Sequence, residues 1–97
     1  MFELFWTYRS QVEFKRLKSD LSLKKRYKAV KKTIGLLAND PHHNSLQTHE
    51  YTSLKGPKGE KVFEAYAEQN TPAAYRVFWY YGPKRDQITV IAITRHG

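Results

Sequence analysis

The chain has 97 residues, no cysteine, and 17 lysine and arginine residues against nine aspartate and glutamate residues, a formal net charge of +8. This length allows one modest hydrophobic core. The lack of cysteine excludes a disulfide framework and a thiolate metal site, and it fits a reducing cytoplasm. The basic balance favours a polyanionic partner, such as nucleic acid, a ribosome or an acidic protein, over a surface that only keeps the chain in solution.

We expect a single domain over residues 1–97. The apolar runs are short, and the first 14 residues already carry Glu3 and Arg9. Neither a signal peptide nor a membrane span is therefore predicted.

The first part of the chain predicts a strand and two helices. Residues 2–8 (FELFWTY) are β-rich and almost continuously apolar, which is typical of a buried strand. Ser10 and Glu13 have the spacing of a capping box, so we expect the first helix to open at Ser10. A second helix is expected from about Leu23 to the stop at residues 39–41 (NDP). The short connection between the two helices predicts a helix hairpin.

The second predicted helix has an apolar stripe and a basic remainder. Apolar side chains recur at helical intervals of four and three residues: Leu23, Tyr27, Val30, Ile34 and Leu37. Lysine and arginine cover most of its other positions. An ordinary solvated surface and a partner-binding surface explain this pattern equally well.

The second half of the chain predicts a loop followed by three strands. Residues 42–61 have loop composition, and the histidines in this segment are interpreted as surface residues rather than metal ligands. Strands are expected over residues 62–68, 74–81 and 87–94, which are separated by turn sequences. The order β-α-α-β-β-β predicts an α+β fold. In it, an N-terminal strand, a helix hairpin and a three-stranded antiparallel meander form one sheet packed on the helices.

The stretch YRVFWYY, residues 75–81, contains five aromatic rings and one arginine. Strand alternation divides its side chains into two sets, Tyr75, Val77 and Trp79 against Arg76, Phe78 and Tyr80. A guanidinium group is rarely buried without a partner. We therefore expect the first set to pack on the helices and the second to lie on an open face.

The strand before it adds a carboxylate to this open face. Alternation and pairing would place Glu64 and Tyr66 beside Arg76. Aromatic rings stack on bases and arginine binds phosphate in a bidentate way, which predicts an RNA contact. A structural Glu–Arg pair sheltered by rings explains the same residues equally well. The last strand is apolar on both faces, as expected of a central strand or of one partly covered by a partner, and the face of Arg95 and His96 is left open.

Three short motifs, LKG at 54–56, YRVFW at 75–79 and TRH at 94–96, occur within this order of elements. Together they resemble the RelE/ParE superfamily of bacterial type II toxins over nearly the whole chain. The resemblance implies a compact toxin neutralised by a cognate antitoxin. Ribosome-dependent members cut mRNA, without metal or another cofactor, through attack of a ribose 2′-OH on the adjacent phosphate.

The resemblance also implies roles for individual residues. Arg76 matches the strand arginine that contacts the scissile phosphate, and Arg95 looks like the arginine at the end of the last strand. His96 is similar to the C-terminal acid or base, and Glu64 is placed to act as a general base. The expected RNA contacts are Lys55 and Lys58, for the backbone, with Tyr66, Phe78 and Tyr80.

Two other functions remain open. Residues 63–68 (FEAYAE) are less basic than the corresponding strand of several ribonuclease members. A ParE-like inhibitor of DNA gyrase needs no nuclease site, and a non-catalytic RNA-binding module would use the rings alone. The expected partners are an antitoxin together with the ribosome and mRNA, or gyrase, in the cytoplasm and without a membrane.

Overall fold

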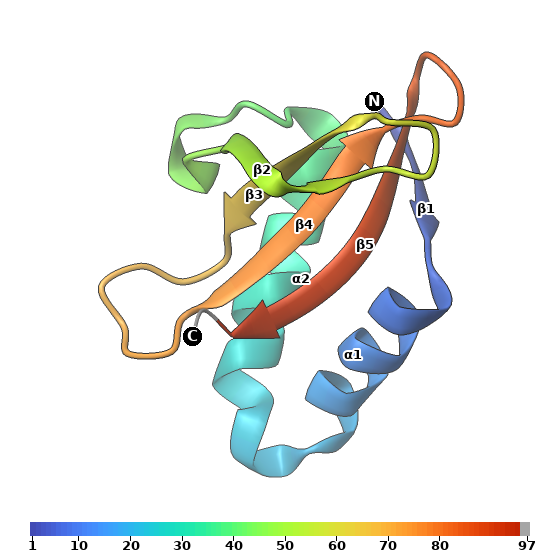
Figure 1. The fold of residues 1–97 in the computed structure, drawn as a ribbon. Helices are drawn as coiled ribbons and strands as arrows, with labels where there is room; N and C mark the ends of the chain where they lie inside the picture. The colour runs from blue at the N-terminus through green and yellow to red at the C-terminus, as the bar shows by residue number, and fades with distance from the viewer. Residues whose placement is uncertain (96–97) are drawn as a thin grey trace.

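The computed structural model describes residues 1–95 and has two layers, a five-stranded sheet and two helices packed on one of its faces (Figure 1). The elements are β1 (Glu3–Trp6), α1 (Tyr8–Ser19), η1 (Leu21–Leu23), α2 (Lys24–Asn39), η2 (Asn44–Leu46), β2 (His49–Lys55), β3 (Lys61–Tyr66), β4 (Tyr75–Tyr81) and β5 (Gln87–Arg95). The predicted α+β class, the helix hairpin and the three-stranded meander are confirmed. The sheet has one strand more than the sequence predicts.

Strand β5 lies inside the sheet, whose order is β1-β5-β4-β3-β2. It pairs in parallel with β1 and antiparallel with β4. Its residues are buried on both faces, with Ile88 and Val90 on one side and Thr89 and Ala92 on the other. A strand covered on both faces has no polar side to present, which explains its continuous apolar sequence. The predicted central strand is confirmed.

The hydrophobic core lies between the sheet and the helices. Helix α2 contributes Val30 and Leu37, and β4 contributes Val77 and Trp79, all without measurable exposure. Tyr75 is half-buried and packs against the same cluster. The predicted helix-facing set of β4 is therefore confirmed.

Helix α1 begins at Tyr8, two residues before the Ser10 start that the sequence predicts. Thr7 is the N-cap, and its Oγ1 accepts a hydrogen bond from the Ser10 N–H at 3.1 Å. Ser10 is fully buried, and its hydroxyl donates to a carbonyl oxygen of β5 at 2.8 Å. Glu13 accepts from a backbone N–H of β5 at 2.8 Å instead of closing a capping box. The polar side chains at this helix start attach α1 to β5, a tertiary contact that no local pattern contains.

The connection between the helices and the end of α2 follow the sequence. Asp20 accepts hydrogen bonds from the backbone and the hydroxyl of Ser22, which closes a tight turn before α2. Helix α2 ends at Asn39, with Asp40 as its C-cap and Pro41 after it. No helix within residues 1–95 is long and apolar enough to cross a membrane.

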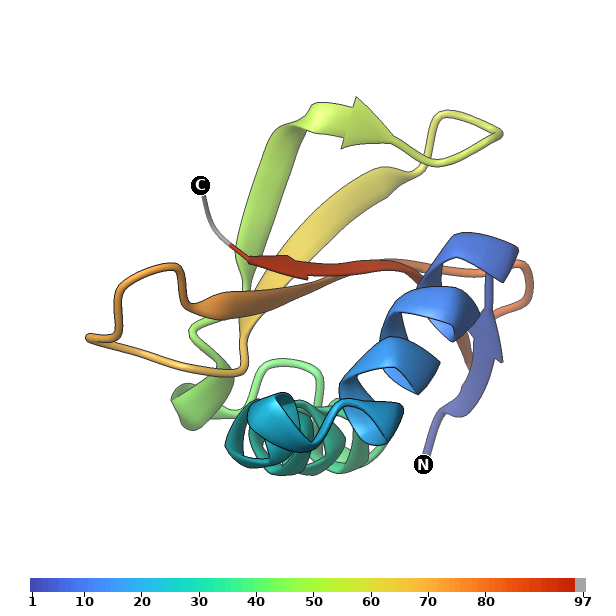
Figure 2. The ribbon, with the colours of Figure 1, turned by 90° about the horizontal axis from the view of Figure 1, so that it is seen from below.

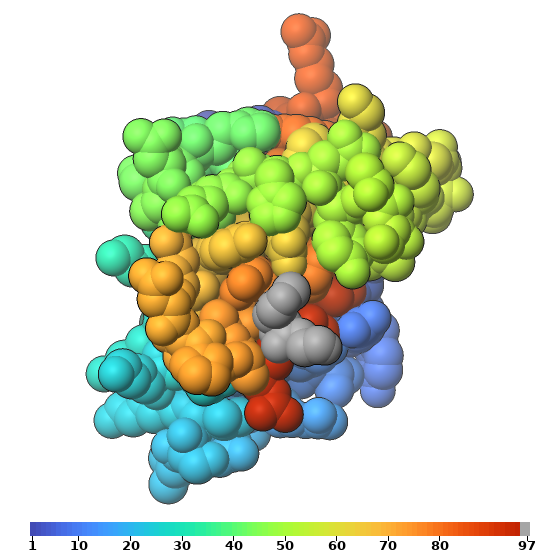
Figure 3. All heavy atoms as spheres, turned by 60° about the vertical axis from the view of Figure 1, so that its left-hand side comes forward, coloured from blue at the N-terminus to red at the C-terminus, as the bar shows by residue number. Residues whose placement is uncertain are grey.

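Strand β2 occupies residues 49–55, which were predicted as a loop. It is the edge strand, its residues are mostly exposed, and it pairs antiparallel with β3. Because no helix covers it, HEYTSLK carries no apolar alternation and resembles a loop in composition. Strands β3 and β2 rise out of the plane of β4 and β5, on the side away from the helices (Figure 2). In the space-filling view, β2 and the turn after it form a ridge across the upper part of the molecule (Figure 3).

Candidate functional site

Three strands bring charged and aromatic side chains together on the sheet face opposite the helices. Strands β3 and β4 pair with Tyr66 opposite Arg76 and with Glu64 opposite Phe78. Strand β2 adds His49 opposite Glu64. Residues that pair across strands point to the same face. We call these five residues the sheet-face cluster, and the predicted grouping of Glu64 and Tyr66 beside Arg76 is confirmed.

Glu64 joins two basic side chains of the cluster. Its side chain is only 7 % exposed, with Oε1 2.8 Å from His49 Nε2 and Oε2 3.5 Å from Arg76 Nε. Removing a carboxylate from water is costly unless it is paired. Glu64 therefore orients the imidazole and balances the guanidinium charge.

Arg76 is buried, with 9 % of its surface exposed, and is held by several weak contacts. Its Cζ lies 3.8 Å from the centroid of the Tyr66 ring, a cation–π contact. Its Nη1 donates to the carbonyl oxygens of Glu68 and Ala74 at 3.4 and 3.3 Å, and its Nε has no hydrogen bond of good geometry. These contacts are longer than charge-assisted hydrogen bonds to a phosphate would be. A phosphate oxygen would therefore form a shorter and stronger hydrogen bond with the guanidinium than these carbonyl oxygens do.

His49 is the exposed ionisable group of the cluster, with 47 % of its side chain accessible. Its Nδ1 lies 3.0 Å from the carbonyl oxygen of Gln47, and its Nε2 faces Glu64. A doubly protonated ring satisfies both acceptors, whereas a neutral ring satisfies one. Both ring nitrogens therefore face acceptors of the protein, so a ligand that takes a proton from the ring must replace one of these acceptors.

The sequence interpretation of His49 as a plain surface histidine missed this contact. The signal lies in β2, where His49, Tyr51 and Ser53 alternate on one face of a short polar strand. Glu64 is a second signal, because a carboxylate in an apolar strand needs more than one basic partner to be buried.

The aromatic part of the face is less open than predicted. Tyr51 of β2 packs against Phe78 with ring centroids 5.0 Å apart. Phe78 is half-buried, whereas Tyr80 is 8 % exposed. The prediction of an open face is wrong for Arg76 and Tyr80, because the sheet curls over them on the side away from the helices. Contacts of Tyr66, Phe78 and Tyr80 with RNA stay predictions.

The two predicted backbone-binding lysines lie at the far end of β2 from His49. Lys55 is exposed, with Nζ 3.7 Å from Glu50 Oε2, and Lys58 is exposed in the turn that follows. The seven residues from His49 to Lys55 span about 20 Å of extended strand. Any RNA that touches both the cluster and these lysines runs along β2.

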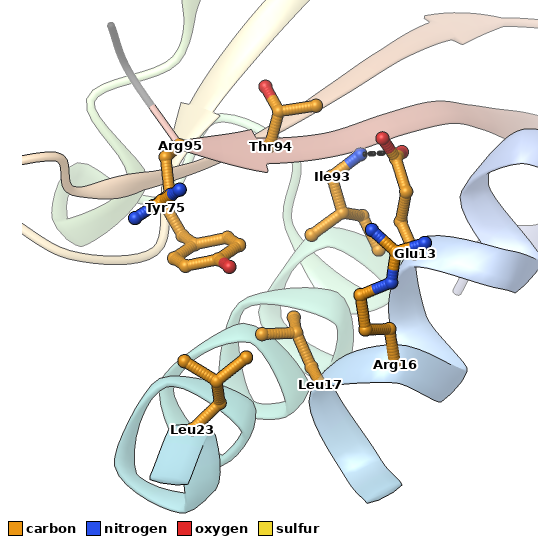
Figure 4. Close-up of a pocket in the computed structure, with 8 residues that line it drawn as sticks. All are labelled: Glu13, Arg16, Leu17, Leu23, Tyr75, Ile93, Thr94 and Arg95. Atoms are coloured by element: carbon orange, nitrogen blue, oxygen red, sulfur yellow. Dashed lines mark hydrogen bonds between the residues drawn. The ribbon is translucent and has the colours of Figure 1, made fainter. Parts of the chain in front are cut away.

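Arg95 lies apart from the sheet-face cluster. It pairs with Tyr75, so it shares the helix-facing side, whereas Thr94 lies opposite Arg76. Arg95 lines a pocket between α1 and the ends of β4 and β5 (Figure 4). The structure therefore does not bring it together with Glu64. His96 lies outside the described residues.

Among the residues that the structure describes, no group of three or more His, Asp or Glu side chains is placed to hold a metal ion.

Solved structures with the same fold are toxins. A YoeB/ParE toxin from Agrobacterium tumefaciens aligns with a TM-score of 0.71 at 15% identity, over 98% of this chain and 99% of that chain. The archaeal RelE–RelB complex from Pyrococcus horikoshii gives 0.66 at 16% identity, over 99% and 96% of the chains. The YoeB dimer from Staphylococcus aureus gives 0.64 at 10% identity, over 99% and 98%.

No protein-family model matches the sequence, and no curated protein is similar to it in sequence. The three structures nevertheless align over almost the whole of each chain. The resemblance to RelE/ParE toxins that the sequence motifs suggest is therefore confirmed for the fold. This chain has the fold of the YoeB, ParE and RelE toxins.

Proposed function

We propose that this chain is the toxin of a type II toxin–antitoxin pair, which cleaves mRNA on the ribosome in the cytoplasm and is neutralised by a cognate antitoxin. The shared fold supports a toxin, and the RelE neighbour was solved as a complex with RelB. One observation carries the nuclease proposal. The half-exposed His49 is held by a buried Glu64 that also contacts Arg76.

The proposed reaction is attack of a ribose 2′-oxygen on the adjacent phosphorus. The bond from phosphorus to the 5′-oxygen breaks, which leaves a 2′,3′-cyclic phosphate and a 5′-hydroxyl. Such a step needs a proton acceptor at the 2′-OH, a proton donor at the leaving oxygen, and cationic stabilisation of the phosphorane.

The three ionisable members of the cluster each fit one part of this reaction. His49 gives up its contact with the Gln47 carbonyl oxygen and donates the proton of Nδ1 to the leaving 5′-oxygen, while Nε2 stays on Glu64. Glu64 orients that ring, and Arg76 exchanges its long carbonyl contacts for the phosphate. For the acceptor at the 2′-OH, the resemblance offers His96.

The test is induced expression in a bacterium with transcript 5′ ends mapped. The native chain should produce new ends within translated codons. His49→Ala and Arg76→Ala should not, while both stay folded by circular dichroism. Arg85→Ala is the matched control, since Arg85 is an exposed arginine in the turn between β4 and β5. New ends that persist in both cluster variants would rule the cluster out as the nuclease site.

A second candidate, inhibition of DNA gyrase, is favoured by the burial of Arg76. An arginine that is 9 % exposed and faces a buried carboxylate is also what a structural pair looks like. In that case native chain and Arg76→Ala should inhibit supercoiling by purified gyrase to nearly the same extent. Growth arrest without new transcript ends would point to this function.

A further inference from the structure

The formal net charge of the protein lies entirely on the helix hairpin. Residues 15–32 contain nine lysine and arginine residues and one aspartate, which gives +8. The rest of the chain contains eight basic and eight acidic side chains and is neutral. Screening limits the reach of a surface charge to about 10 Å in salt solution. An anionic partner is therefore attracted to the hairpin and not to the molecule as a whole.

Most of these cations are exposed and make no ion pair. Arg26 is the exception, because it is half-buried, donates to the Ala73 carbonyl oxygen at 3.1 Å and lies 4.0 Å from Glu68 Oε1. The other eight side chains are exposed, and within residues 1–95 none of them pairs with a carboxylate. Asp20, the one acid of the segment, accepts two hydrogen bonds from Ser22 instead.

A leucine projects from the middle of these cations. Leu21 is 86% exposed and lies in η1, at the lower end of the molecule in Figure 1. Its neighbour Leu23 packs against the hydrophobic core, and the Leu23 N–H donates to the Asp20 carbonyl oxygen at 2.9 Å. A closed turn thus keeps Leu21 in water, although its transfer to an apolar environment is favourable.

Lysine side chains surround Leu21. Two depressions, of about 310 and 460 Å³, share Leu21, Lys24 and Lys28 in their walls. The smaller depression also includes the half-buried Tyr27. Lysine lays its methylene groups along apolar surface and keeps its ammonium group in water. The leucine and the lysine stems therefore form an apolar surface fringed by ammonium groups, over residues 18–28, which we call the hairpin tip.

We propose that the hairpin tip binds the surface of an anionic lipid bilayer. Leu21 enters the boundary between headgroups and acyl chains, and the surrounding lysines contact lipid phosphates. Each lysine near such a surface strengthens binding by about fivefold. The bilayer surface is thus a further partner, beyond those expected from the sequence.

A bilayer fits the hairpin tip better than a nucleic acid does. Seven of the nine basic residues in 15–32 are lysines, whereas arginine is the residue that binds a phosphate group in bidentate geometry. A nucleic acid backbone also provides no apolar phase for Leu21. A lipid headgroup layer provides both mobile phosphates and an apolar phase beneath them.

The hairpin tip belongs to the helix layer, and the sheet-face cluster lies on the face of the sheet opposite the helices. The proposal therefore stands without RNA cleavage, and vesicle binding can succeed or fail independently of the transcript mapping.

The test is cosedimentation with vesicles of equal parts phosphatidylglycerol and phosphatidylcholine. The native chain should bind these vesicles, should not bind phosphatidylcholine alone, and should be released by added salt. Lys24→Glu with Lys28→Glu should weaken binding by at least about 25-fold. The control is Lys84→Glu with Arg85→Glu, which makes the same change of net charge in the exposed turn at the other end of the molecule (Figure 1). It should weaken binding far less.

Leu21 separates insertion from attraction by charge alone. Leu21→Ser keeps every charge and should weaken vesicle binding by about tenfold, because an apolar side chain no longer leaves water. Fluorescence of Leu21→Trp should shift to shorter wavelength with anionic vesicles, more than that of the native chain, whose Trp6 and Trp79 lie outside the hairpin tip. Equal binding of the two charge-reversal variants, full binding of Leu21→Ser, or binding to single-stranded RNA but not to vesicles would each overturn the proposal.

Discussion

At the scale of single residues, Glu64 has the largest predicted energetic role, because it faces two basic side chains from a buried position. Glu64→Gln would leave the Arg76 charge buried without a counter-ion. The free energy of unfolding should fall by about 3–5 kcal/mol, measured by urea denaturation at neutral pH.

The control for this prediction is Glu50→Gln on the neighbouring strand. Glu50 pairs with Lys55 at 3.7 Å, and more than half of the lysine side chain is exposed. Loss of such a pair should change the free energy of unfolding by less than about 0.5 kcal/mol. Equal losses of unfolding free energy in the two variants would show that the contacts of Glu64 stabilise the fold no more than the exposed Glu50–Lys55 pair does.

Tyr81 makes stability depend on alkaline pH. Burial, and secondarily the negative charge of Asp40, raise the pKa of its hydroxyl above the ordinary 10.0. The folded chain therefore keeps the phenol neutral where the unfolded chain ionises. This contribution to stability is complete below the unfolded pKa and is lost as pH rises through the folded pKa.

The measurement is urea denaturation of native chain and Tyr81→Phe between about pH 9 and about pH 11. The native chain should lose more stability over this range, because lysine titration is common to both proteins and cancels in the difference. Parallel pH profiles would contradict the raised pKa.

Predictability at this scale depends on how local the cause is. The burial of Val77 and Trp79 follows from strand alternation, which needs only neighbouring residues. The burial of Arg76 depends on how β3 and β2 curl over β4. This is a tertiary feature that the residues next to Arg76 in the sequence do not encode. For the same reason His49 looked like a loop residue until its strand partner was known.

At the scale of elements, the start of α1 tests how a helix is fixed to a sheet. Thr7 accepts from the Ser10 N–H and donates to Ile91, each at 3.1 Å. Thr7→Ala removes both bonds and should lower the free energy of unfolding by about 1–2 kcal/mol.

Ser19→Ala at the other end of α1 is the control. Its hydroxyl is exposed and makes one long hydrogen bond, of 3.4 Å, to Arg16. Its removal should change stability by less than about 0.5 kcal/mol. A Thr7→Ala variant as stable as Ser19→Ala would show that other contacts position α1.

Elements with a strong hydrophobic periodicity in the sequence were predicted correctly. Elements that depend on tertiary contacts were not. The stripe of α2 and its stop at Asn39 are local features. Strand β2 was not predicted because an exposed edge strand needs no apolar face. The side of Arg95 was undecided because the β4–β5 register shifts between Phe78 and Trp79, an irregularity that alternation alone does not reveal.

At the scale of the whole molecule, the charge of +8 should govern affinity for RNA. Each phosphate contact with a single strand contributes about −0.7 to the slope of log K against log salt. Removing Lys55 and Lys58 together should therefore make the slope about 1.4 units shallower.

Fluorescence polarisation of a short single-stranded RNA between about 50 and 200 mM salt measures this slope. Lys24→Ala with Lys25→Ala is the matched control, since it removes the same charge from the helix layer. A slope that changes equally in both double variants would indicate a diffuse field instead of a path along β2.

The position of β5 has a consequence for the moment at which the protein folds. Thr7 bonds to Ile91 across 84 residues of sequence, and both β1 and α1 rest on this interior strand. Contacts of such span make folding slow compared with local hairpins. A nascent chain that ends before residue 87 has no β5 and therefore no closed core. During synthesis of the intervening segment, β1 and α1 lack the strand against which they pack. The activity that we propose for this chain therefore requires synthesis of residues 87–95, and a shorter nascent chain would lack it.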